Sequence, residues 1–207
     1  MVASNMLAEI ILLTGEVEAP HLSSMLHSHN SMINIVHVDT ADQLSAACEI
    51  ALPHGKNRRL IAFCTRAIVP ERILNNLNGP AYNFHPGPPT YPGSHPASFA
   101  IYEKARKYGV TVHEMTAQVD TGPIVAVKWF EISPKMRFAD LELHAYKFLV
   151  ATFSKMAKRL ATNALPLPYS GDKWSGNTST NEEFESMRKI TEDMDEEEIK
   201  RRFRAFG

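Results

Sequence analysis

Three polar side chains between residues 83 and 120 have the chemistry that acyl transfer requires. Asn83 and His85 lie two positions apart before a loop rich in proline and glycine, and Asp120 follows about three dozen residues later. An amide and an imidazole can donate hydrogen bonds to an oxyanion, and a carboxylate beside the imidazole can hold or accept a proton. This set predicts transfer of an acyl group to an amine. Without the surrounding motifs, Asn83 could simply cap a turn, and His85 and Asp120 could form a structural pair.

The segments before Asn83 alternate between strand and helix patterns, which predicts a parallel sheet with crossover helices. The expected strands are 8–15, 33–38 and 60–64, and the expected helices are 20–29, 41–52 and 70–77. Ligands of such sheets bind at the carboxyl ends of the strands. Because Asn83, His85 and Asp120 lie at or after predicted strand ends, we expect them to meet in one crevice.

The second half of the chain is expected to extend the same sheet and to cover it. The expected elements are strand 81–85, helix 96–109, strands 110–115 and 124–130, helix 139–160, loop 166–180 and helix 196–204. The fold class that this order predicts is α/β: a Rossmann-like, mostly parallel twisted sheet flanked by helices. We expect a catalytic domain over residues 1–165 and a C-terminal loop and helical extension over residues 166–207.

The composition is typical of a globular protein of ordinary polarity. The chain has 207 residues, of which 44% are hydrophobic, and a formal net charge of -1, so neither nucleic acid nor an anionic membrane is an expected partner. Residues 56–59 are expected to form a solvated turn, and Cys64 is expected to be a buried free thiol. Residues 1–6 lack the pattern of a secretory signal, and together with the thiol this favours a cytoplasmic location.

Several spaced motifs around the three polar residues resemble those of the folate-dependent formyltransferase family, which includes methionyl-tRNA formyltransferase, glycinamide ribonucleotide transformylase and amino-sugar N-formyltransferases. The similar segments are Asn83 to Pro86, Tyr91 to Gly93, Pro96, Ala100-Ile101, Gly109 to His113 and Asp120 to Ile124. The resemblance implies a formyltransferase-like fold, 10-formyltetrahydrofolate as the formyl donor and no metal. It also implies that Asn83, His85 and Asp120 are the catalytic residues.

The resemblance further implies which residues contact the two substrates. The residues expected at the folate are Ile68, Val69, Pro70, His113, Val119 and Gly122, and those expected at the acceptor are Tyr91 and Gly93. For His113 and for residues 68–70, packing without a ligand is an equally simple reading. A metal site at His27 and His29 is not expected, because two residues two positions apart on a helix point in different directions.

The acceptor is expected to be the amine of a small molecule, such as an amino sugar. In the family's transformylase, a turn after the first strand binds a phosphate, whereas here Gly15 is followed by Glu16 and Glu18, whose carboxylates repel a phosphate. We expect no nucleic-acid or membrane partner, and a homodimer is the assembly to test. Two other functions remain open: a hydrolase that releases formate from the folate, and a folate-binding module without activity.

Overall fold

The computed structural model describes residues 6–207, with side chains from Leu7 onward. Residues 1–5 lie outside the described residues, and with them most of the segment over which no secretory signal is expected. In the part of the chain that is described, no helix combines the length and apolar character that a membrane crossing requires.

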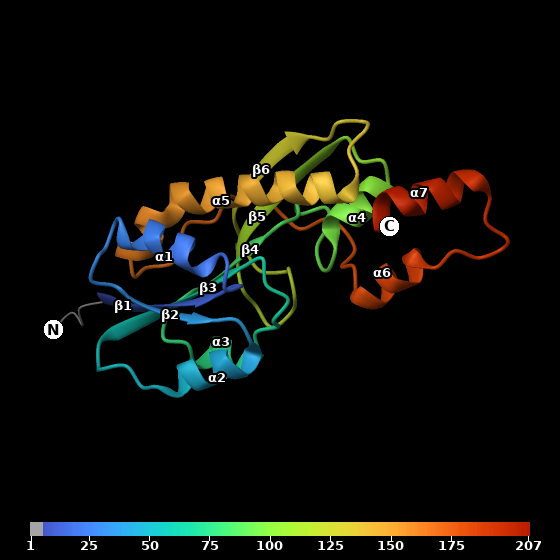
Figure 1. Cartoon of the computed structure of the whole chain (residues 1–207). Helices are drawn as coiled ribbons and strands as arrows, with labels where there is room; N and C mark the ends of the chain where they lie inside the picture. Colours follow the sequence, from blue (N-terminus) through green and yellow to red (C-terminus); the bar gives the residue numbers. More distant parts are fainter. Residues whose placement is uncertain (1–5) are drawn as a thin grey trace.

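The described residues form a six-stranded sheet in the order β2-β1-β3-β4-β5-β6 (Figure 1). The strands are β1 (Met6–Leu13), β2 (Asn34–Val38), β3 (Lys56–Phe63), β4 (Ala81–His85), β5 (Lys107–Glu114) and β6 (Ile124–Glu131). Strands β1 to β4 run parallel to one another, whereas β5 runs antiparallel to β4 and β6 antiparallel to β5. The predicted α/β class with a mostly parallel sheet is confirmed.

Helices cover both faces of this sheet (Figure 1). The helices are α1 (Ala19–His27), α2 (Ala41–Glu49), α3 (Glu71–Asn76), α4 (Pro96–Tyr102), α5 (Phe138–Thr162), α6 (Asn181–Arg188) and α7 (Glu196–Phe206). Of these, α6 and α7 lie beyond the sheet, with α7 beside α4 (Figure 1). Successive strand residues point to opposite faces. Thus Ile10 and Leu12 of β1 pack in the core with α1 and α5, and Ile11 and Leu13 pack in the core with α2 and α3.

The expected solvated turn at residues 56–59 is wrong, because these residues begin β3 and two of their cations are buried. Arg58 Nε lies 2.6 Å from Oε1 of the buried Glu9. Arg59 is fully buried and donates to main-chain carbonyls at the end of α5 and just after it, including that of Leu165 at 3.0 Å. Each buried charge therefore has a partner that offsets its lost hydration.

The expected helix over residues 96–109 is too long. Helix α4 ends at Tyr102, Lys104 adopts a left-handed φ of 56°, and β5 begins at Lys107. Gly109, read as a helix stop, lies inside β5, where a Cβ atom would come 2.6 Å from the carbonyl oxygen of Lys128 on β6. A glycine can mark a helix end or a close approach of two backbones, and only the pairing of β5 with β6 distinguishes them.

The expected buried state of Cys64 is also wrong. Cys64 turns out of β3 with a φ of 47°, and its side chain is exposed. Although the side chain reaches solvent, the protein atoms packed around its sulfur displace part of the water that would hydrate a thiolate. Together with the nearby carboxylates of Glu18 and Glu142, this raises the pKa of the thiol to about 12. The thiol therefore remains protonated at neutral pH, which makes it a poor nucleophile.

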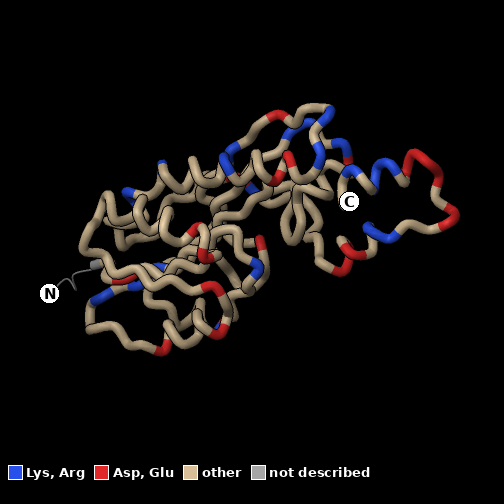
Figure 2. The backbone as a smooth tube through the Cα atoms, viewed as in Figure 1, with Lys and Arg blue, Asp and Glu red and all other residues tan. Residues whose placement is uncertain are grey.

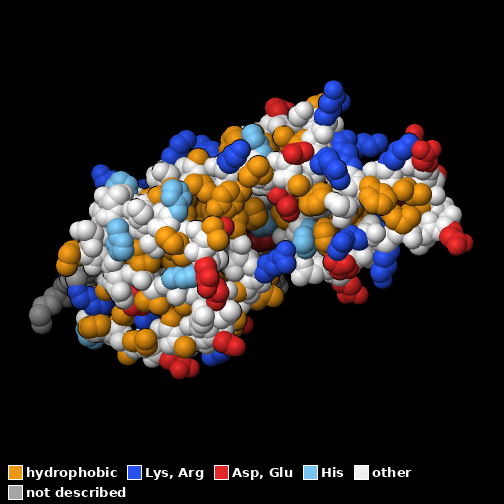
Figure 3. All heavy atoms as spheres, in the orientation of Figure 1, with side chains coloured by type: hydrophobic (Ala, Val, Ile, Leu, Met, Phe, Trp, Pro, Cys, Tyr) orange, Lys and Arg blue, Asp and Glu red, His pale blue; other side chains and the backbone are white. Residues whose placement is uncertain are grey.

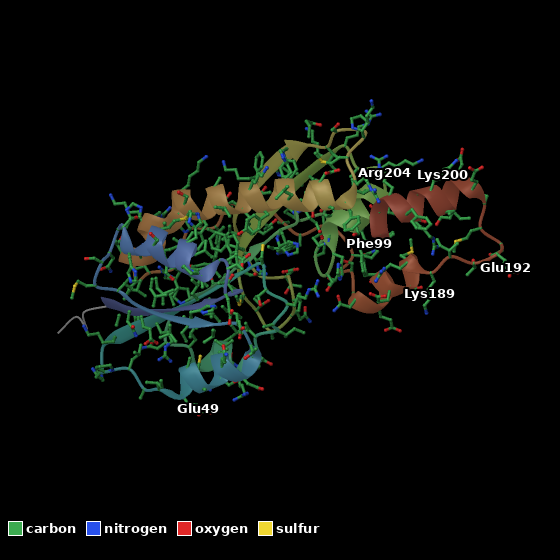
Figure 4. All side chains as sticks on the ribbon, in the orientation of Figure 1. Glu49, Phe99, Lys189, Glu192, Lys200 and Arg204 are labelled. Carbon is green, nitrogen blue, oxygen red and sulfur yellow. The ribbon has the colours of Figure 1, made fainter. Side chains whose placement is uncertain are left out.

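The C-terminal segment packs on the rest of the protein. Helix α7, which was expected, carries acidic residues in its first turn and basic residues further along (Figure 2). Its Phe206 is buried, with its ring 5.4 Å from that of Phe99 on α4, which Figure 4 labels. Leu167 and Ala205 are also part of the core. Helix α6 was not predicted, although Thr180 and Glu183 form its capping box. The division at residue 165 stays a prediction.

Candidate active site

Asp120 reaches the other polar residues because the β5–β6 loop folds back across the sheet. Strand β5 runs antiparallel to β4, with Thr111 opposite His85 and Glu114 opposite Tyr82. The loop after Glu114 therefore starts at the amino end of β4, away from His85. We expected a crevice at the carboxyl ends of parallel strands. The residues do converge, but the returning loop is what brings Asp120 to them.

The carboxylate of Asp120 is the centre of a buried hydrogen-bonded cluster. Its Oδ1 lies 3.0 Å from His113 Nε2 and 3.3 Å from Asn83 Nδ2. Its Oδ2 lies 3.3 Å from His85 Nδ1 and accepts the main-chain N–H of Gly93 at 2.8 Å. The three titratable members are each no more than 4% exposed. The structure thus brings Asn83, His85 and Asp120 together and adds His113 to them.

The loop that carries Asp120 is held in a restricted conformation. Asp120 has a φ of 48°, which is unfavourable for a residue with a Cβ atom. Two positions later, a Cβ atom on Gly122 would lie 1.8 Å from the carbonyl oxygen of Glu114, so only glycine fits there. Such strain persists where surrounding contacts hold the backbone, as the hydrogen bonds to Asp120 do.

Burial and neighbouring charge shift the pKa values of Asp120 and His85 in opposite directions. Burial alone would raise the pKa of Asp120, but His85, the hydrogen bond from His113 and the N–H of Gly93 together hold that pKa well below its usual range. Burial lowers the pKa of His85, and Asp120 opposes this only in part. Asp120 is therefore ionised at neutral pH, and the buried imidazole of His85 binds a proton less readily than a solvated imidazole does.

The second nitrogen of His85 faces a carbonyl oxygen of the protein itself. Nε2 donates to the main-chain oxygen of Tyr91 at 3.1 Å, and Gly87 leaves room for the ring, since a Cβ atom there would lie 2.5 Å from Nε2. The Tyr91 side chain points elsewhere, with its hydroxyl 2.7 Å from Glu103. A substrate oxygen can receive the Nε2–H bond only if the loop over residues 86–93 moves Tyr91 O away.

The remaining expected contact residues lie on the loop between β3 and α3 and on the loop between β5 and β6. Ile68 is 69% exposed and Val119 is 49% exposed, so both side chains are accessible to a ligand or to solvent. Val69 packs against the core beneath α2 and α3, and Pro70 is the N-cap of α3. The expected role of these residues at the folate remains a prediction. In the described part of the chain, no three His, Cys, Asp or Glu residues are grouped so as to hold a metal.

Trp174 belongs to the site, although it lies in the predicted loop 166–180 and nothing in its local sequence indicated a role. Its indole Nε1 donates to the carbonyl oxygen of Gly122 at 2.8 Å. Its ring lies edge-on to His113 and His85, with ring centres 5.0 and 5.9 Å away. The segment is anchored on both sides of the tryptophan by main-chain bonds, from Ser170 to Ile124 and from Ser179 to Pro92.

A protein-family model described as formyl transferase matches residues 46–148. Over this span, which includes Asn83, His85 and Asp120, the chain belongs to the formyl transferase family. The family resemblance in the motifs is thereby confirmed.

Curated relatives agree with this assignment. The chain is 30% identical over 101 residues to methionyl-tRNA formyltransferase of Rhizobium etli, a match that covers 48% of this chain and 32% of the relative. It is 28% identical over 94 residues to phosphoribosylglycinamide formyltransferase of Bacillus subtilis, covering 45% of this chain and 48% of that one. The matches therefore span at most about half the length of these relatives.

Solved structures share the fold over nearly the whole chain. A sugar N-formyltransferase from a Shewanella species superimposes with a TM-score of 0.77 at 16% identity, covering 96% of this chain and 87% of the other. An N-formyltransferase from Helicobacter canadensis, solved with folinic acid and dTDP-3-aminofucose, gives a TM-score of 0.70 at 17% identity, covering 97% of this chain and 81% of the other.

Proposed function

We propose that this protein transfers a formyl group from 10-formyltetrahydrofolate to the amine of a small-molecule acceptor, an amino sugar or a similar metabolite. The convergence of Asn83 and His85 on the buried carboxylate of Asp120 carries this proposal. Family membership over residues 46–148 supports it. The folinic acid and the amino-sugar nucleotide in the Helicobacter protein support a folate donor and an amine acceptor.

Asn83 and His85 would stabilise the negative charge that forms on the formyl oxygen. The amide of Asn83 carries two N–H groups, so one can remain near Asp120 while the other donates to the formyl oxygen. His85 would donate from Nε2 once the loop over residues 86–93 moves the main-chain oxygen of Tyr91, now 3.1 Å away, out of this position. Donors of this kind typically contribute about 100-fold to 1,000-fold in rate each.

Asp120 and His85 would also move the two protons of the reaction. The amine nitrogen forms a bond to the formyl carbon, and the bond from that carbon to the folate nitrogen breaks. Asp120 would accept the proton that the amine loses, through a water, and His85 would supply the proton that the folate nitrogen gains. Because Asp120 Oδ2 lies 3.3 Å from His85 Nδ1, the proton can return along the same contact and restore the site.

The substrates would enter from the loops beside this cluster. We assign folate contacts to Ile68, Val69, Pro70, His113, Val119 and Gly122, and acceptor contacts to Tyr91 and Gly93. The exposed side chains of Ile68 and Val119 would provide apolar surface for the folate ring. Gly93, whose N–H donates to Asp120 and whose φ is 95°, would keep the acceptor side of the loop free of a side chain.

The test follows release of tetrahydrofolate from 10-formyltetrahydrofolate by the purified full chain, with and without a panel of amino sugars and simpler amines. We expect release that depends on the amine, together with a formylated amine detected by mass spectrometry. Release of tetrahydrofolate and formate without any amine would instead identify a hydrolase. Folate binding without turnover under all conditions would identify a binding module, and either result would overturn the proposal.

A further inference from the structure

Strand β2 forms one edge of the sheet and is accessible from outside. Within the described residues it pairs with β1 only, as the first strand in the sheet order. Asn34 and His37 are exposed, and Ile35 and Val36 are half-buried. At the left of Figure 3, where α1 lies above β2, the coloured polar side chains are mainly histidines, whereas lysines and arginines gather toward α7. An accessible edge strand can pair with a strand of another chain.

The main-chain groups of Ile35 and His37 point away from β1. The N–H of Thr14 donates to the carbonyl oxygen of Val38 at 3.0 Å, so the main chain of Val38 faces β1. Main-chain groups of successive strand residues point to opposite edges, which directs those of Ile35 and His37 outward. In the part of the chain that the structure describes, no other group bonds these N–H and C=O groups. Each of the two residues therefore offers a donor and an acceptor at the edge.

The opposite edge of the sheet has features that discourage pairing with another chain. Strand β6 contains Lys128 and Glu131, and the N–H of Ser170 donates to the carbonyl oxygen of Ile124 at its start. Charged side chains and covering loops are common means of protecting an edge strand. Residues 34–38 of β2 include no lysine, arginine, acid or proline. Of the two edges, that of β2 is therefore the one suited to pairing.

A second copy of the chain would match the β2 edge. A two-fold axis perpendicular to the sheet makes the two β2 strands antiparallel. With this axis beside Val36, Ile35 of each copy lies opposite His37 of the other copy. Residues that face each other in this way exchange both N–H···O bonds, so every outward donor and acceptor of the two residues finds a partner.

We propose that two copies of this protein pair through β2 and form a homodimer with one continuous sheet. Strand β4, which carries Asn83 and His85, is separated from β2 by β1 and β3, so the contact leaves both catalytic clusters free. Because β2 has 5 residues, the interface is at the small end of specific contacts, and we expect a dissociation constant on the order of 10 µM. The inference does not depend on formyl transfer.

The test is sedimentation velocity of the full chain from about 1 to about 200 µM, a range that spans the expected dissociation constant. We expect the wild type to change from monomer to dimer. His37→Lys places two ammonium groups close together across the axis and should raise the dissociation constant at least about tenfold. His37→Pro removes the outward N–H without removing a bond to β1 and should have a similar effect.

Two control variants separate pairing from other effects of these substitutions. The His37 ring contacts the carbonyl oxygen of Thr14 at 2.9 Å, and His37→Ala loses this contact but keeps the outward N–H, so it should still dimerise. Trp129→Lys introduces a lysine on β6, at the opposite edge, and should leave the dissociation constant unchanged. Circular dichroism of all four variants should be that of the wild type.

Hydrogen exchange followed by nuclear magnetic resonance locates the contact. The amides of Ile35 and His37 should exchange more slowly as the protein concentration rises. The inference is overturned if the wild type stays monomeric, if His37→Lys and His37→Pro dimerise as it does, or if Trp129→Lys weakens the dimer as much as they do. A dimer in which these two amides exchange freely has another interface, and protection that is independent of concentration means that another segment of the chain covers β2. Either result also overturns the inference.

Discussion

Oδ2 of Asp120 lies 3.3 Å from Nδ1 of His85, and both side chains are buried. The pair links the last residue of β4 to the loop between β5 and β6, and a main-chain N–H from Gly93 fixes the same carboxylate oxygen at 2.8 Å. Burial makes the contact sensitive to the charge of either partner, because little water is present to screen it.

Removing either partner should stop catalysis without unfolding the protein. We expect His85→Ala and Asp120→Asn each to lower the rate of amine-dependent tetrahydrofolate release at least about 100-fold, since each removes a proton-transfer or oxyanion-stabilising group. Far-ultraviolet circular dichroism should remain that of the wild type. Asp193→Asn, at an exposed position, is the control. A rate near that of the wild type in either variant would exclude that residue from the mechanism.

The stability of the protein should depend on Asp120 in acid. The folded-state pKa of Asp120 is below its ordinary value of 3.8, so the carboxylate stabilises the fold fully above about pH 4. This contribution is lost as the pH falls through the lower folded value. We therefore expect the difference in free energy of unfolding between wild type and Asp120→Asn to shrink below about pH 4, as measured by urea unfolding at several pH values. A difference that stays constant from pH 7 to pH 2 would contradict the assigned charge.

Trp174 should hold the catalytic loops through both its N–H and its ring. Trp174→Phe removes the bond to Gly122 and should cost about 1 kcal/mol of stability. Trp174→Ala also removes the packing on His85 and His113 and should cost about 2 kcal/mol or more, with a larger loss of turnover than the phenylalanine variant. The same substitutions at Trp129, which is 46% exposed on β6, should have smaller effects on turnover. Equal effects at both positions would argue against a specific role.

Arg59 should contribute strongly to stability. Arg59→Met leaves the carbonyls at and after the end of α5 without their buried donor and should lower the free energy of unfolding by about 3 kcal/mol. Arg159→Met, at an exposed position in the last turn of α5, should cost less than about 1 kcal/mol. Chemical denaturation of the two variants measures both values, and a small effect at Arg59 would show that water replaces the guanidinium there.

Much of the fold could be predicted from local sequence patterns, because residues close together in the chain largely specify where a strand or helix begins and ends. Short apolar runs closed by turn residues predicted β1 to β4, and Pro70 and Pro96 marked the starts of α3 and α4. The stripe of apolar residues predicted α5, and acids followed by bases predicted α7. These signals depend on the period of a strand or helix and on helix termini, which neighbouring residues set.

Long-range contacts decided the rest. The burial of Arg59 depends on carbonyls about 100 positions later in the chain, and the strand position of Gly109 depends on pairing with β6. No local pattern reports either contact, so residues 56–59 resembled a solvated turn and residues 103–109 resembled the end of a helix.

For the site, the sequence by itself determined which chemical groups are present: an amide, an imidazole and a carboxylate at Asn83, His85 and Asp120, within motifs that identified the family. Only the tertiary structure decided how they meet, because β5 reverses direction and its loop returns Asp120 to His85. It also added Trp174, more than 50 positions beyond Asp120, since a contact between distant segments depends on the path of the whole chain rather than on the residues beside it.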